Sequence, residues 1–279
     1  MIKNRMLSYI EIKSPVHSVT GAAKFIIFLF WSVLVMVSFN TPVLVFLSVL
    51  GFVLFKLSKI RLSDVNFIFK IMSLFLVLNL AAIYLFSPEQ GVIIYKTRNV
   101  IFEGRGRFTL TWEQLFYEFN IFLKYLTIIP PAIILIVTTH PSEFAASLNK
   151  IGVPYTAAYA VSLTLRYIPD VQRDFEAIFQ SQQARGLELS GKASIISRIK
   201  RTVPLLLPLI FSSLERIDTI SRAMELRGFG KNKKRTWYSQ KPAEKTDVIS
   251  VVICILIFTA GIYITFKDGT RFFNLLPGN

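Results

Sequence analysis

The sequence contains very little of the chemistry that metal sites and disulfides require. Among 279 residues there are one cysteine, Cys254, and two histidines, His17 and His140. Cys254 has no partner for a disulfide, and neither histidine has a second ligand at the spacing that zinc sites use. We therefore expect no disulfide, no metal site and no cofactor site in this chain, and packing is the expected role of Cys254.

Ionisable residues are also scarce within the long apolar stretches. Channels and ion-coupled transporters place such groups near mid-membrane, where an ion or proton is bound and passed on. Here the interior polar residues are Asn79, Glu118 and Lys124, and the last two do not face each other on a helix. We expect them to pack or to lie at an interface, and a secondary transporter or channel is the alternative function. Paired carboxylates or a serine beside a base are absent too, so no catalytic residue is predicted.

What the chain has in abundance is apolar surface. Hydrophobic residues make up 53% of it, with 25 Phe, and charged residues only 18%. This is the composition of a membrane protein, and apolar stretches of about 17 to 25 residues predict spanning helices. The predicted fold is all-α and polytopic, with five spans at residues 22–39, 41–56, 65–86, 112–138 and 248–266. The first two spans form a hairpin around Asn40-Thr41-Pro42, because proline ends one helix and can open the next.

Lysine and arginine predict the orientation, since they are retained on the cytoplasmic side. Residues 139–247 carry 17 Lys or Arg against 10 Asp or Glu, and the segment before the first span is basic as well. We expect a cytoplasmic N-terminus, an external C-terminus and three segments: spans one to four in 1–138, a cytoplasmic helical domain in 139–247, and the last span with its tail in 248–279. The basic loop 87–111, expected outside, is the exception.

The formal net charge of +15 invites a nucleic-acid interpretation. A membrane chain already needs positive residues inside to orient itself, so we expect no nucleic-acid partner. The basic run 231–235 fits anionic lipid headgroups, or a solvated turn, equally well.

Residues 186–192 match the GxxxxGK spacing of a phosphate-binding loop. Such a loop needs a preceding strand, a following helix and a Ser or Thr after the lysine to hold Mg²⁺. Ala193 stands in that place, and residues 170–185 have helical spacing. The sequence therefore argues against ATP binding by this chain.

Two helices of the polar segment end in the same way. The apolar stretches 153–168 and 203–214 are too short or too interrupted to span, and each continues into a longer helix. The first helix ends in Ala184-Arg185-Gly186 and the second in Leu226-Arg227-Gly228, an offset of 42 residues (227 minus 185). Glycine after the last helical residue is a common helix stop, and arginine complements the helix dipole there. However, the Arg-Gly ending occurs twice, and the planar guanidinium of arginine pairs bidentately with an acceptor group. These two facts favour a second interpretation, in which the two arginines bind in two similar pockets, or sockets, on partner proteins.

These residues resemble a known family. The stretch TTHPSEFAASLNKIGVPYTAAYAVSLTLRYIPDVQRDFEAIFQSQQARG, followed by VPLLLPLIFSSLERIDTISRAMELRGFG, is similar to the transmembrane T component (EcfT) of energy-coupling factor transporters. The similarity covers residues 138–230, and the N-terminal SPVHSVTGAAK agrees with it. One departure is Leu226, where the family usually has alanine.

The resemblance implies a scaffold in a prokaryotic cell membrane. It would link two cytoplasmic ATPase subunits, which bind ATP and Mg²⁺ themselves, to a membrane-embedded S component that captures a vitamin or trace metal. By this resemblance Ala184, Arg185, Gly186, Leu226, Arg227 and Gly228 couple to the ATPases. The apolar surface that would hold the S component includes Tyr155, Ala158, Leu165, Leu206 and Phe211.

Overall fold

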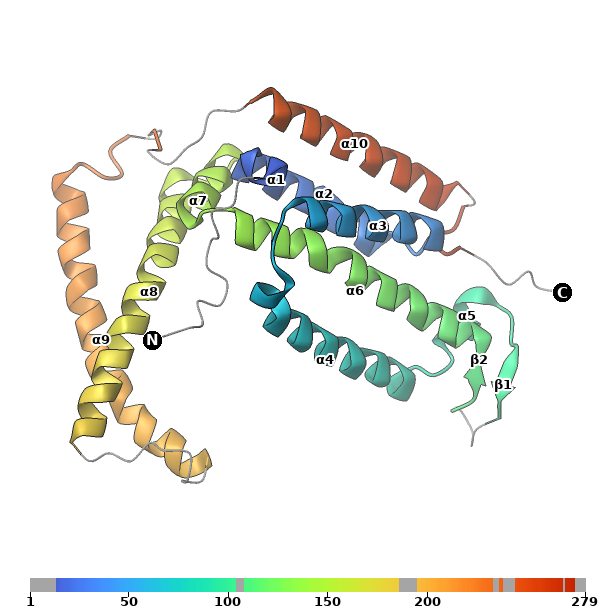
Figure 1. The fold of residues 1–279 in the computed structure, drawn as a ribbon, viewed down its shortest axis with the longest axis horizontal. Coiled ribbons are helices and arrows are strands. Elements are labelled where there is room, and N and C mark those ends of the chain that lie inside the picture. The colour runs from blue at the N-terminus through green and yellow to red at the C-terminus, as the bar shows by residue number, and fades with distance from the viewer. Residues whose placement is uncertain are drawn as a thin grey trace. The chain divides into compact units, whose positions relative to one another are not determined.

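The computed structural model describes residues 14–103, 108–185, 195–232, 236–237, 244–267 and 269–273 (Figure 1). Its helices and strands are, in chain order, α1 (Pro15–Ser18), α2 (Gly21–Val37), α3 (Thr41–Leu57), α4 (Leu62–Phe86), α5 (Gln90–Tyr95), β1 (Val100–Phe102), β2 (Leu110–Thr111), α6 (Trp112–Thr138), α7 (Pro141–Lys150), α8 (Tyr155–Ala184), α9 (Ile195–Leu226) and α10 (Lys245–Phe266). The prediction of an all-α membrane protein is confirmed.

The chain divides into two compact units. The first comprises Met1–His140 together with Lys241–Asn279, and the second is Pro141–Gln240. The last apolar helix, α10, therefore packs with the N-terminal helices, and α7, α8 and α9 form a unit of their own.

The first unit contains five apolar helices, together with the short elements α1, α5, β1 and β2. Within α4, α6 and α10 the apolar segments are 22, 27 and 22 residues long, sufficient to cross a membrane. α2 and α3 are shorter, with 17 residues each, which corresponds to about 26 Å of helix against a hydrocarbon core of about 30 Å. The five predicted spans coincide with these five helices, with small shifts at their ends.

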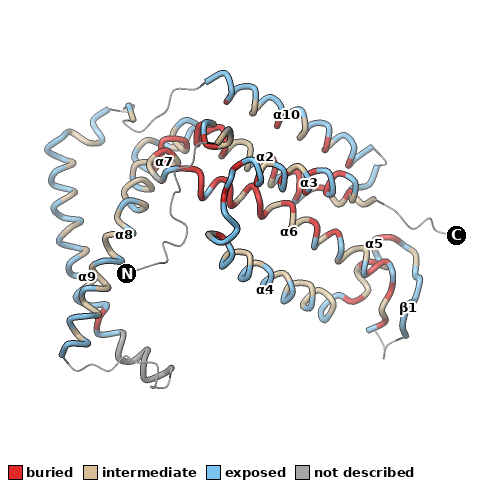
Figure 2. The backbone as a smooth tube through the Cα atoms, viewed as in Figure 1, coloured by how far each residue is buried: buried red, intermediate tan, exposed pale blue. Residues whose placement is uncertain are grey.

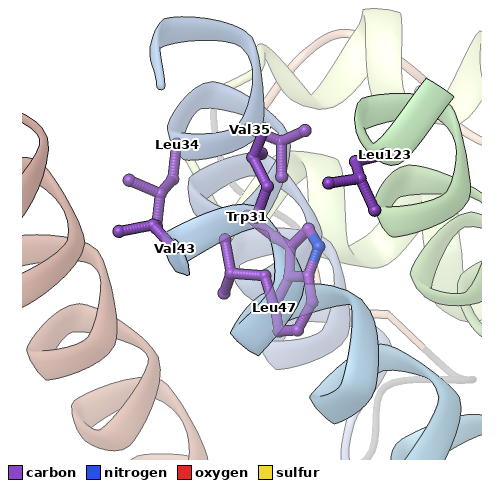
Figure 3. Packing of buried hydrophobic residues seen from close by; sticks show 7 residues of the cluster. Trp31, Leu34, Val35, Val43, Leu47 and Leu123 are labelled. Atoms are coloured by element: carbon purple, nitrogen blue, oxygen red, sulfur yellow. The ribbon is translucent and has the colours of Figure 1, made fainter. Parts of the chain in front are cut away.

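The α2–α3 hairpin turns where the sequence predicted. The side chain of Asn40 caps α3 by accepting a hydrogen bond from the Val43 N–H at 3.3 Å, and Pro42 lies in the first turn. The two helices then bury apolar residues against each other and against α6 (Figure 3). This core consists of Trp31, Leu34, Val35, Val43, Leu44, Leu47 and Leu123.

Helix α6 is the centre of this unit and continues through Pro130 and Pro131. Proline has no N–H, so Pro131 leaves the carbonyl of Thr127, four residues earlier, without its helical donor. The indole Nε1–H of Trp31 donates to that carbonyl at 3.1 Å. A residue of α2 thus compensates the interruption in α6, and Figure 2 shows α6 as the most continuously buried helix.

The ends of the helices are joined by hydrogen bonds that define two opposite ends of the bundle. At one end Lys24 Nζ donates to the Thr138 carbonyl at 3.0 Å, joining the start of α2 to the end of α6. At the other end Phe39, in the α2–α3 turn, pairs with the segment after α10: its N–H donates to the Arg271 carbonyl at 3.1 Å. α6 therefore runs antiparallel to α2 and α10 runs parallel to it, as the predicted topology requires.

Asp247 ties α10 to α2 at the first of these ends. Its carboxylate is buried and accepts hydrogen bonds from the Thr20 N–H at 2.8 Å and from the Glu244 N–H at 2.9 Å. We expect Asp247→Ala to lower the free energy of unfolding by about 1–3 kcal/mol, because the buried Thr20 N–H loses its acceptor. Thermal unfolding in detergent measures this, with the exposed Glu103→Ala as the matched control. Equal midpoints for the two variants would contradict the assignment.

The segment 87–111, expected to be a loop, is an ordered cap in its described part. β1 and β2 pair antiparallel, and α5 packs on the start of α6. The buried Glu113 accepts from the Asn99 N–H at 3.0 Å, and Gln114 Oε1 accepts from the Gly91 N–H at 2.9 Å. A Cβ at Gly91 would lie 2.3 Å from the Glu113 carbonyl, so glycine alone permits this approach. Burial raises the pKa of Tyr95, at the end of α5, to about 12.

Two of the three polar residues that the sequence singled out within the spans, Glu118 and Lys124, have local partners, and Asn79 is half-buried on α4. Lys124 Nζ donates to the Met36 carbonyl at 2.9 Å and lies 3.2 Å from the centroid of the Phe39 ring. Glu118 accepts from Gln114 Nε2 at 3.0 Å. Lys124 therefore caps the end of α2, and both contacts fit the structural role that was expected. Cys254 is buried against α2, with its Sγ 3.8 Å from the Ile27 carbonyl.

Candidate functional site

The second unit is built from two long amphipathic helices, α8 and α9, which contact each other, while α7 packs against α8 (Figure 1). α8 runs through Pro169, and α9 through Pro204 and Pro208, without interruption. The turn that starts α8 uses Gly152, whose φ of +106° favours glycine. Asn149 fixes this turn by donating its Nδ2–H to the Val153 carbonyl at 2.9 Å.

The end of α9 shows what the glycine of the second motif does. The Phe229 N–H donates to the Met224 carbonyl at 2.9 Å, the Gly228 N–H donates to the Glu225 carbonyl at 2.9 Å, and Gly228 has a φ of +66°. This is the Schellman arrangement of a helix end. The capping role expected of Gly228 is confirmed. Because the motif uses only backbone atoms, it does not explain why residue 227 is an arginine.

Both motif arginines present their side chains at the surface of the unit. Arg185 is the C-cap residue of α8, its N–H donates to the Ser181 carbonyl at 3.2 Å, and it is exposed. Arg227 is exposed as well, and Leu226 beside it is 90% exposed. Ala184 is also exposed, whereas Gly186 lies outside the described residues, as does the stretch 186–192.

An aromatic cluster that sequence reasoning missed holds the chain after the second motif. The ring of Phe229 lies 4.8 Å from that of Tyr159 and 5.6 Å from that of Tyr155, and Trp237 lies 5.4 Å from Tyr155. Trp237 Nε1–H also donates to Asn149 Oδ1 at 3.2 Å. The end of α9 is thereby attached to the start of α8. The available signal was Phe229, since an apolar residue commonly follows the glycine of a Schellman motif.

The residues that were expected to contact the S component differ in how far they are exposed. Leu206 and Phe211 on α9 are 41% and 62% exposed, and Leu165 on α8 is half-buried. Ala158 is 0% exposed and packs inside the unit, and Tyr155 is half-buried in the aromatic cluster. Ala158 therefore cannot be part of an exposed contact surface, and Tyr155 has an internal partner.

α9 carries a continuous apolar surface that we name the α9 stripe. Large apolar residues recur along it at intervals of three and four residues, which places them on one side of a helix. All of them are exposed within the unit: Val203, Leu206, Leu207, Ile210, Phe211, Leu214 and Ile217. Figure 2 shows this helix as mostly exposed over the part whose burial is described. A contiguous apolar patch of this kind marks a contact with a membrane or with another protein.

Between α8 and α9 lies an open groove of about 400 Å³. Its lining is mainly apolar and includes Leu163, Tyr167, Val171, Ile217, Ile220 and Met224. Within the described part of the chain no three His, Cys, Asp or Glu side chains come together as a metal site would require.

Comparison with known proteins agrees with this arrangement. The model of the CbiQ family, described as cobalt transport protein, matches residues 13–238. The chain is 29% identical over 276 residues to the energy-coupling factor transporter transmembrane protein EcfT of Staphylococcus aureus, covering 92% of this chain and 96% of that one. It is 28% identical over 257 residues to the EcfT of Lactococcus lactis subsp. cremoris, covering 89% and 93%, and 27% identical over 262 residues to that of Brevibacillus brevis, covering 91% and 95%. The chain thus belongs to the CbiQ family, and its resemblance to the T component of energy-coupling factor transporters is confirmed.

Proposed function

We propose that this chain is the membrane scaffold through which two ATPase subunits drive uptake by a separate, membrane-embedded S component. The observation that carries the proposal is the pair of exposed arginines, Arg185 and Arg227, at the ends of two crossed helices. The Schellman end accounts for Gly228 through backbone atoms alone. The planar fork of an arginine pairs bidentately with an acceptor group in a partner's groove, and both copies of the motif carry that fork.

The α9 stripe supports the second half of the proposal. Its exposed apolar residues fit the apolar surface of a membrane protein, and the S component is the occupant that the T-component role requires. The substrate would then be chosen by the S component, and a vitamin or a trace metal is the proposed class. ATP and Mg²⁺ would be bound by the ATPase subunits. The lipid bilayer surrounds the five apolar helices.

We also propose that the N-terminus is cytoplasmic and the C-terminus external. An odd number of spans places the two termini on opposite sides, and the basic segment 139–247 favours the cytoplasm for the helical unit. The proposed prokaryotic cell membrane follows from the family relationship.

Purification from native membranes tests the function directly. We expect the affinity-purified chain to retain two ATPase chains and one small membrane protein, identified by mass spectrometry. The chain purified alone should neither hydrolyse ATP nor move a solute across proteoliposomes. Robust ion or solute flux by the chain alone would refute the scaffold and favour the secondary transporter or channel.

A further inference from the structure

One ion pair joins α8 to α9 at their crossing. Arg216 Nη2 lies 2.5 Å from Asp174 Oδ2, and both side chains are 32% exposed. The Arg216 guanidinium also lies 5.9 Å from the centroid of the Tyr167 ring on α8. A second ion pair of this unit, Arg173–Asp170, stays within α8.

The position of this pair matches the internal repeat of the sequence. Asp174 and Arg216 are 42 residues apart (216 minus 174), which is the offset between Arg185 and Arg227. Val171 and Ser213, both in the lining of the groove beside the crossing, have the same offset. The two helices therefore cross at equivalent points of the repeat, as elements related by an approximate two-fold axis do.

The two motif arginines lie at equal distances along their helices from the ion pair, and we call each of these distances an arm. Each motif arginine lies 11 residues beyond the ion pair, 185 minus 174 on α8 and 227 minus 216 on α9. Eleven helical residues correspond to about 16 Å. A rotation of about 10° at the crossing would displace each arginine by about 3 Å on an arm of that length. A fork that must meet acceptors bidentately cannot tolerate such a displacement.

We infer that the Asp174–Arg216 ion pair is the pivot that fixes the crossing of α8 and α9 and hence the separation of Arg185 and Arg227. This inference rests on the proposed function only where it concerns uptake, because the separation is a property of the chain itself. Asp174 and Arg216 are positioning residues.

The first experiment measures the separation in the isolated full chain. Cys254 is replaced by alanine, and spin labels are attached to cysteines introduced by Ser181→Cys and Ala223→Cys. Both positions are exposed, lie four residues before the motif arginine of their helix, and are again 42 residues apart. We expect one narrow distance distribution in lipid nanodiscs, and a broader or shifted one in Asp174→Asn. The charge exchange Asp174→Arg with Arg216→Asp should restore the narrow distribution. Asp170→Asn, which removes the ion pair within α8, is the matched control.

An unchanged distance distribution between the two labels in Asp174→Asn would overturn the inference that this ion pair is the pivot, whatever the function of the protein. The exchange variant is not needed for this decision, so a failure of that variant to fold leaves the result interpretable.

The second experiment measures uptake by the complete transporter. We expect Asp174→Asn to lower uptake per ATP hydrolysed by about tenfold, within the range of coupling between contacting charged residues, and the exchange variant to recover most of it. A changed separation with normal uptake would support the pivot and count instead against the proposed role of the two arginines. A changed separation with impaired uptake supports both.

Discussion

Replacing Arg185 and Arg227 together with lysine is expected to abolish uptake, or to uncouple it from ATP hydrolysis, while the protein remains folded and inserted. Each arginine would leave water for a groove, and breaking a hydrogen-bonded charge pair there costs about 2–5 kcal/mol. At about 1.4 kcal/mol per tenfold, one lost link should weaken assembly by about 30-fold or more. Lysine keeps the charge but cannot reproduce a bidentate fork.

The same variants distinguish two roles of the arginines: pairing with a socket on a partner protein, and ordinary helix capping. The cap of α9 depends on backbone bonds of Gly228 and Phe229, which lysine at 227 leaves intact. Capping alone therefore predicts nearly normal uptake. Arg222→Lys, an exposed arginine on the same helix, is the matched control. ATPase retention and uptake are measured in proteoliposomes. Near-normal uptake by the double variant in an intact complex would mean that both arginines act only as helix caps.

Placing glutamate at Leu206 and Phe211 should release the S component while both ATPases stay bound. The α9 stripe is exposed in this chain, and a carboxylate buried in an apolar interface loses its hydration without gaining a partner. Central contacts of such interfaces commonly contribute about 2 kcal/mol or more, so we expect at least about a 30-fold loss of affinity. Copurification of the S component with the variant complex measures it.

Ser212→Glu is the control for this experiment, because Ser212 is exposed but lies on the side of α9 opposite the middle of the stripe. Equal retention of the S component by the double variant and the control would mean that the stripe serves another purpose. Loss of the ATPases together with the S component would point instead to misfolding of the helical unit.

The membrane architecture could be predicted because its causes are local or compositional. A helix in a bilayer satisfies its own backbone groups, so length and hydropathy suffice to find α2, α3, α4, α6 and α10. The hinge at Asn40 and Pro42 and the helix end at Gly228 were visible for the same reason, since caps involve residues within one turn. The repeat of two Arg-Gly endings is likewise a property of the sequence alone.

Tertiary contacts decided the rest. The cap around Glu113 and Gly91 could not be predicted because its bonds join residues that no periodicity relates. The same holds for Trp31, whose indole serves a carbonyl freed by Pro131 on another helix. Ala158 reads as part of an exposed apolar face until the packing of the helical unit buries it.

The 42-residue repeat and the Asp174–Arg216 ion pair separate most clearly what the sequence determines from what the tertiary structure decides. The 42-residue offset is present in the amino-acid sequence, but it does not tell whether the two copies ever meet. Only the crossing of α8 and α9 brings Asp174 to Arg216, because a contact between helices depends on their relative position and on the direction of each side chain. The sequence by itself determined that the chain spans a membrane and has two matched arginine ends, and the tertiary structure decided which surfaces remain open to partners.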